Sequence, residues 1–251
     1  MDDRYVYGVL RAGADPAISE GGVGDEAVEL VTSGGLAALV SPAPPGEVPG
    51  NRRNLMAHSR VLQEAARDTS VLPMRFGVVM PSESEVRQEL LDAHAEQLLA
   101  QLETFDGLAE LEVKLLCPED ELLRAVVSEH PELVKRREAL EGRPPEATYY
   151  ERIELGELVA GALDAKREEL MRRVLERVEP LSAATEIGER LHEQMVANIA
   201  LLVERERIPE VDAAVDRLGE ELGPNIRVRY VGPLPPYSFA TLDGTEASAW
   251  A

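Results

Sequence analysis

Runs of apolar residues predict the strands in the first part of this chain. Short runs at residues 5–10 and 36–40 are rich in β-branched and aromatic residues and end at turn-forming residues, which is typical of buried strands. A third extended segment, residues 71–80, is interrupted by Pro73 and Gly77, which favours an edge strand or a bulge over a central strand. The first hundred residues are therefore predicted to contain a small sheet.

Helical spacing of apolar residues predicts two helices in the same part of the chain. Residues 51–68 form one helix, with Leu55, Leu62 and Ala66 expected on a single apolar face. A second helix over residues 82–104 begins at a Ser-x-x-Glu capping box. Strands and helices are thus mixed in a smaller N-terminal α+β region.

The second half of the chain has a different order of elements. Residues 195–203 fit a buried strand or the middle of a helix, and we predict a strand. The predicted order is a strand at 111–115, helices at 119–141 and 153–178, a strand at 195–203, a helix at 209–222 and a strand at 226–230. With one uncertain segment before residue 195, this is the order of a ferredoxin-like βαββαβ unit that carries a helical insertion.

The expected fold is therefore α+β with two domains. Residues 1–107 form the N-terminal α+β domain, and residues 108–242 form the ferredoxin-like domain with a long helix and a helical insertion at 119–150. Residues 243–251 are predicted to be a flexible tail.

Charge and cysteine content exclude several classes of protein. The 251 residues include 47 acidic and 26 basic side chains, a net charge of -21, which repels nucleic acid and anionic membranes. The single cysteine, Cys117, excludes a disulfide scaffold. The sequence starts with no secretory signal and its longest apolar run, 195–203, is too short to span a bilayer, so we expect a cytoplasmic protein.

No pattern of residues points to catalysis or to a cofactor. The four histidines, His58, His94, His130 and His192, lie far apart and lack partners at metal-ligand spacing. Glycine-rich phosphate loops and the Gly-x-Ser-x-Gly elbow do not occur. We therefore predict no metal, no cofactor and no enzymatic activity.

A proline-rich segment follows the last predicted strand. It includes Pro233, Pro235, Pro236, Tyr237 and Phe239. We interpret it as a rigid strap whose aromatic rings pack back onto the protein. The alternative is a ligand for an aromatic-lined groove, because the segment contains a Pro-x-x-Pro pattern.

At these residues the chain closely resembles the gas vesicle protein family GvpF/GvpL. The resemblance runs in family order over about residues 5 to 242. The matching segments are Tyr5-Val-Tyr-Gly, Asn54-Leu-x-x-His58, Val71-Leu-Pro-Met-Arg-Phe-Gly77, Leu111-Glu-Val-Lys114, Tyr149-Tyr-Glu-Arg152 and Gly232-Pro-x-Pro-Pro-Tyr-Ser-Phe239. Leu234 stands where this family is expected to carry tryptophan, so no role of that ring is carried over.

The resemblance implies a non-enzymatic accessory or minor structural protein of gas vesicle assembly. Such a protein binds the hydrophobic shell subunit and other accessory proteins during nucleation, without a cofactor, in the cytoplasm and at the gas vesicle. We expect the contact with the shell subunit at the extended segment around residues 71–79. Arg75, Phe76 and Val78 are the candidate contact residues, although Phe76 also fits the core. The alternative is a small-molecule-sensing regulatory protein of tandem ferredoxin-like domains. A third class, an enzyme, would require a cleft with His58 or His192 beside a carboxylate.

Overall fold

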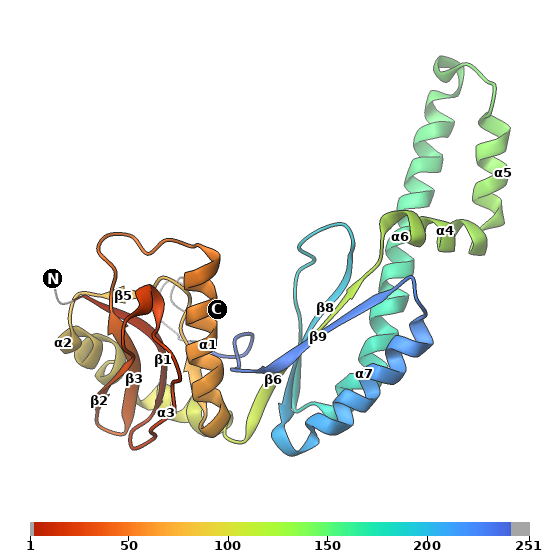
Figure 1. Ribbon diagram of the computed structural model, residues 1–251. Helices are drawn as coiled ribbons and strands as arrows, with labels where there is room; N and C mark the ends of the chain where they lie inside the picture. Colours follow the sequence, from red (N-terminus) through yellow and green to blue (C-terminus); the bar gives the residue numbers. More distant parts are fainter. Residues whose placement is uncertain (1–2, 242–251) are drawn as a thin grey trace. The chain divides into compact units, whose positions relative to one another are not determined.

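The computed structural model describes residues 3–241 of the chain and contains two compact units (Figure 1). Within the described part, the first unit consists of residues 3–111, 202–205 and 232–241, and the second of residues 112–201 and 206–231. The predicted division after residue 107 stays a prediction, and the C-terminal strap lies in the first unit. The predicted flexible tail, 243–251, lies outside the described residues.

An antiparallel sheet forms the centre of the first unit. Its strands are β1 (Arg4–Arg11), β2 (Glu29–Ser33), β3 (Leu36–Pro42), β4 (Val71–Pro73) and β5 (Val79–Met80). The order is β2-β3-β1-β4, and β5 pairs with β1 as well. Six consecutive residues of β1 are buried because both faces of this strand are covered, which explains its continuous apolar sequence.

Close packing around β1 restricts one of its residues to glycine. A Cβ atom at Gly8 would lie 2.6 Å from the Leu72 carbonyl oxygen and 2.9 Å from Cδ2 of Leu62. The β1–β3 register also shifts between Val6 and Gly8, so Tyr7 is the extra residue of a bulge. Tyr5 and Tyr7, on either side of Val6, both reach the core cluster.

Helices cover this sheet, in positions that agree in part with the sequence. They are α1 (Arg52–Asp68), α2 (Glu83–Glu85), the π-helix η2 (Val86–Asp92) and α3 (Ala95–Thr104), together with the 3-10 turn η1 (Val23–Asp25). The predicted helix 51–68 is confirmed, and the Asn51 side chain caps it by accepting from the Asn54 N–H. Leu55 is 43% exposed, contrary to expectation, because Asn54 takes the buried position in the first turn.

The predicted single helix over 82–104 is wrong in detail. Its start is as expected, since the Ser82 hydroxyl accepts from the Glu85 N–H at 3.3 Å. A π-turn then shifts the helical register, and His94, with φ -117° and ψ 18°, separates it from α3. Apolar spacing did not reveal this interruption because Leu90, Leu98 and Leu102 are buried on both sides of it.

The second sheet has the strand order β7-β8-β6-β9. Its strands are β6 (Leu108–Leu116), β7 (Ala184–Ile187), β8 (Met195–Glu204) and β9 (Arg227–Leu234). The ambiguous run 195–203 is a buried strand, as predicted. Along β6, Leu111, Val113 and Leu115 are buried, which confirms the alternating pattern.

Longer helices accompany the second sheet. They are α4 (Glu119–Glu129), α5 (Pro131–Leu140), α6 (Tyr149–Val178) and α7 (Ile208–Leu222), with 3-10 turns η3 (Pro145–Thr148), η4 (Glu179–Leu181) and η5 (Arg205–Arg207). Figure 1 shows α4 and α5 beside the first part of α6, where a helical insertion was expected. The α+β class is confirmed, whereas the ferredoxin-like assignment stays a prediction. Within residues 3–241, no helix is long and apolar enough to cross a membrane.

Candidate partner-binding site

The segment predicted as an edge runs along one side of β1 in the first unit. β4 and β5 both pair antiparallel with β1, through Gly8 opposite Pro73 and Tyr5 opposite Val79. Between these two short strands the Met74 N–H donates to the Tyr7 carbonyl at 2.8 Å. No further strand pairs with β4 or β5 in the part of the chain that the structure describes. Residues 71–80 therefore form an outer edge of the sheet, which we call the edge segment.

A buried hydrogen-bond network fixes the middle of the edge segment. His58, on α1, has Nε2 at 3.1 Å from the Met74 carbonyl oxygen, so Nε2 carries the proton. Nδ1 then accepts from the Tyr5 hydroxyl at 2.9 Å, and this hydroxyl accepts from the Gly77 N–H at 3.1 Å. These bonds anchor the turn at residues 74–77 at both of its ends, Met74 and Gly77.

Aromatic rings surround this network. The ring centroid of Phe76 lies 6.1 Å from that of Tyr5 and 5.8 Å from that of His58, in edge-on arrangements. The Tyr7 ring stacks on the His58 ring, with their centroids 5.6 Å apart. Offset and edge-on contacts of this kind stabilise a cluster beyond the apolar area that they bury.

Burial keeps the histidine and the tyrosine uncharged. The pKa of His58 falls from 6.5 to about 4, because burial lowers it by more than the bond to the Met74 carbonyl raises it. Burial likewise raises the pKa of Tyr5 above its ordinary value. Both groups are therefore neutral at pH 7. Because the Met74 carbonyl can only accept, it places the single proton of His58 on Nε2 and leaves Nδ1 as the acceptor for the Tyr5 hydroxyl.

The three candidate partner-binding residues have different environments. Arg75 is exposed, Phe76 is half-buried against the aromatic rings, and the Val78 carbonyl accepts from the Val6 N–H at 3.0 Å. Phe76 thus packs against the core cluster, the alternative that the sequence left open. The sequence did not point to Val79, which is 38% exposed at this edge.

The proline-rich segment joins the same unit. Ser238 donates to the fully buried carboxylate of Glu110 through its N–H at 2.7 Å and its hydroxyl at 2.8 Å. The Tyr237 ring packs against the core cluster, and burial raises its pKa. Of the remaining strap residues, Pro235 and Pro236 are buried, Phe239 is half-buried and Pro233 is exposed. The assignment of this segment as a strap stays a prediction, and Glu110 is a partner of Ser238 that the sequence did not reveal.

Neither of the two histidines considered for catalysis has the geometry of an acid–base pair. His58 is bonded to Tyr5 and to a backbone carbonyl rather than to a carboxylate. His192 lines an open hollow with Glu119 and Glu193 and, within residues 3–241, bonds to neither. The described residues contain no group of three or more His, Cys, Asp or Glu side chains that could hold a metal ion.

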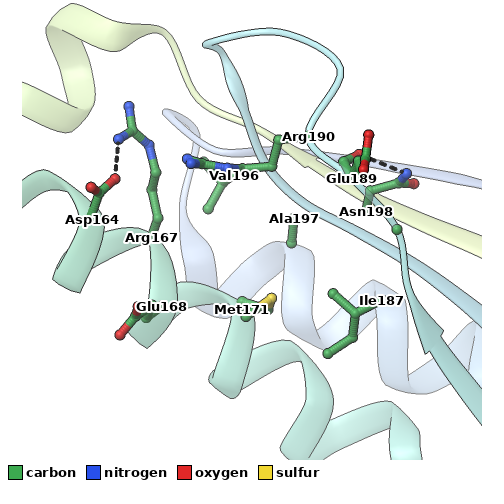
Figure 2. A pocket seen from close by; sticks show the side chains of 11 residues that line it. Asp164, Arg167, Glu168, Met171, Ile187, Glu189, Arg190, Val196, Ala197 and Asn198 are labelled. Atoms are coloured by element: carbon green, nitrogen blue, oxygen red, sulfur yellow. Dashed lines mark hydrogen bonds and ion pairs between the residues drawn. The ribbon is translucent and has the colours of Figure 1, made fainter.

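The second unit contains a separate pocket of about 460 Å³. Figure 2 shows side chains from α6 on one side of it and from the β7–β8 connection and β8 on the other. Arg167 and Arg190 approach it from these two sides. No sequence pattern indicated this pocket, because its lining comes from two separate segments, residues 164–171 and 187–198.

The architecture defines an α+β protein built around two sheets, with the edge segment of the first sheet as its candidate site. The family model described as gas vesicle synthesis protein GvpL/GvpF matches residues 3–241. The chain therefore belongs to the GvpL/GvpF family, as the sequence motifs predicted, and takes part in gas vesicle formation.

Named relatives and a solved structure cover nearly the whole chain. Gas vesicle protein F of Streptomyces sp. (strain CB03234) is 38% identical over 240 residues, which is 94% of this chain and 98% of that protein. Gas vesicle protein L of the same strain is 31% identical over 262 residues, 94% of this chain and 92% of that protein. The crystal structure of GvpF from Anabaena sp. PCC7120 has 25% identity and a TM-score of 0.85, covering 97% of this chain and all of that one. These relatives are named as gas vesicle proteins and not as enzymes.

Proposed function

We propose that this protein is a non-enzymatic assembly protein that binds the hydrophobic gas vesicle shell subunit through the edge segment and limits its aggregation during nucleation. It acts in the cytoplasm at the forming vesicle, together with other accessory proteins. The observation that carries the proposal is an exposed apolar residue, Val79, on a sheet edge whose neighbouring turn is rigid.

The backbone direction at Val79 suits the addition of a partner strand. Consecutive residues of a strand direct their N–H and C=O groups to opposite edges, and the Val78 carbonyl already accepts from β1. The N–H and C=O of Val79 accordingly face away from β1, beside a side chain that is 38% exposed. An added strand would bond to these groups and place an apolar residue against the valine.

The aromatic cluster lowers the entropic cost of such binding. An edge that is mobile before binding must be ordered by the partner, which reduces the affinity. Here the bonds from His58 to Met74 and from Gly77 to Tyr5 hold the turn next to Val79. Arg75 is exposed beside this turn and is the candidate for polar contact with the partner.

Net charge explains how the bound subunit stays dispersed. The chain carries -21, so complexes of this protein with an apolar subunit repel one another. This effect requires no nucleotide and no cofactor. It predicts that protection against aggregation weakens as salt screens the repulsion.

A proline substitution at the edge tests this proposal. Val79→Pro removes the outward N–H while leaving the bonds of β1 to its neighbours, and Val79→Thr is a matched control that keeps the N–H and the branched shape. Each variant is co-expressed with the shell subunit, and the subunit retained on the purified protein is measured. We expect at least about a tenfold loss of retained subunit for the proline variant only, since strand pairing depends on that donor.

Circular dichroism and thermal unfolding show whether each variant retains its fold. If the folded proline variant retains as much subunit as the wild type, pairing at this edge is wrong. If the threonine variant loses as much as the proline variant, the contact depends on the side chain and the backbone pairing is wrong.

A further inference from the structure

The pocket in the second unit is lined by apolar residues, two arginines and three acidic residues. Met171 of α6, Ile187 at the end of β7, and Val196 and Ala197 of β8 form its apolar floor (Figure 2). Ile187 is 54% exposed, so part of this floor faces solvent. A volume of about 460 Å³ lies in the range of small-molecule sites in proteins.

Backbone and amide contacts hold the wall of the pocket in place. The Gly188 N–H donates to the Asn198 carbonyl at 2.9 Å, and the Asn198 side-chain amide donates to the Glu189 carbonyl at 3.2 Å. A Cβ atom at Gly188 would lie only 2.5 Å from Nδ2 of Asn198. A side chain at residue 188 would displace the Asn198 amide, whose bond to Glu189 holds the start of the loop that carries Arg190.

Two guanidinium groups with unused donors border the pocket. Arg167 is largely buried and donates from Nη1 to the Asp164 carboxylate at 2.9 Å, while its buried Nε has no hydrogen-bond partner. Arg190 has no hydrogen bond or ion pair within residues 3–241. In Figure 2 the Arg190 side chain extends toward α6, whereas the Arg167 guanidinium turns toward Asp164. A buried donor without a partner is unfavourable, so a ligand that accepts from it would be stabilised.

The acidic residues of the lining do not neutralise both arginines. Asp164 is paired with Arg167. In Figure 2 the carboxylate of Glu168 points away from Arg190, and Glu189 contributes its backbone carbonyl to the contact with Asn198. Arg190 is thus the positive charge for which the described lining supplies no counter-ion.

We propose that this pocket binds a small carboxylic acid with a short apolar body. The carboxylate lies between Arg167 and Arg190 and accepts charge-assisted hydrogen bonds from both, and the apolar body covers Met171, Ile187 and Val196. The site lies within the second unit and does not depend on the proposed binding of the shell subunit.

Titration of the full-length protein with hexanoate, hexylamine and hexanol, followed by ligand-observed NMR or calorimetry, tests the site. We expect hexanoate to bind at least about tenfold more tightly than the amine or the alcohol, because only the carboxylate pairs with the guanidinium groups. Affinity should also rise up to about fourfold for each methylene from butanoate to hexanoate, as the floor is covered.

Variants separate the charged and the apolar contributions. Arg190→Gln should weaken hexanoate binding at least about tenfold, and Ile187→Gln should reduce the gain per methylene. Arg172→Gln is the matched control on α6, since this arginine pairs with Glu176 and does not line the pocket. Equal affinities for hexanoate and hexanol, tighter binding of hexylamine, no effect of Arg190→Gln, or no binding of hexanoate at about 10 mM would each overturn the proposal.

Discussion

His58 makes the stability of the first unit depend on pH. Burial lowers its pKa from 6.5 to about 4 in the folded protein. Between these values the unfolded chain binds the proton and the folded protein does not, so the free energy of unfolding falls as the pH is lowered. The contribution is fully present above pH 6.5 and is lost progressively toward pH 4, with a total of about 3 kcal/mol. Between pH 7.5 and pH 5 the expected loss is about 2 kcal/mol.

Protonation of His58 lowers the stability because it disrupts the hydrogen bond from Tyr5. A proton on Nδ1 of His58 faces the hydroxyl of Tyr5, which already accepts from the Gly77 N–H. The Tyr5 hydroxyl would then lose its acceptor, and the turn next to Val79 would lose one of its anchors.

Urea unfolding followed by circular dichroism at pH 7.5 and pH 5 measures this effect. The carboxylates of this acidic chain also titrate in this range, so the informative quantity is the difference between the wild type and His58→Gln, which can bond but does not titrate. We expect the wild type to lose about 2 kcal/mol more than the variant on acidification. An equal loss in both proteins would show that His58 is not responsible.

Four further substitutions have defined outcomes. Tyr5→Phe leaves the buried Nδ1 of His58 without a partner and removes the bond to the Gly77 N–H, so it should lower the free energy of unfolding by about 1–3 kcal/mol in urea titrations at pH 7.5, whereas a loss below about 0.5 kcal/mol would contradict the network. Ser238→Ala removes one hydroxyl bond to Glu110 and should cost about 1–3 kcal/mol; an unchanged unfolding midpoint would contradict the anchoring of the strap. Phe76→Ala should lower Tm because the ring packs on the core, whereas Arg75→Ala should reduce shell-subunit capture; an unchanged Tm for the first or unchanged capture by a folded Arg75→Ala variant would contradict these assignments.

Most elements of the fold follow from local sequence, because their signals are periodic. The helix ending at Leu222 has the spacing and flanking residues typical of a helix, whereas the continuous apolar run at 195–203, a buried strand in the structure, fits a strand and a helix alike. The interruption of the helix over 82–104 did not follow, because a π-turn changes the register without a proline or glycine to mark it. The exposure of Leu55 depends on how α1 lies over the sheet, so it could not be predicted from the spacing of apolar residues either.

The candidate sites are harder to predict because their residues are distant in sequence. Tyr5 and His58 are 53 positions apart, and each would read locally as an ordinary core residue. Ser238 and Glu110 are separated by 128 positions, and nothing near either residue indicates the other. The motif around Arg75 and Phe76 indicated the segment proposed for partner binding, but only the register of β1 places Val79 at its outer edge.

Co-expression of the full chain with a gas vesicle shell subunit tests the proposed function most directly. The other accessory proteins are present, and the soluble and aggregated fractions of the subunit are measured after affinity purification of this protein. Binding through the edge predicts that the subunit copurifies and that its soluble fraction rises relative to cells without this protein. A folded protein that retains no subunit and leaves its soluble fraction unchanged would contradict the proposed function.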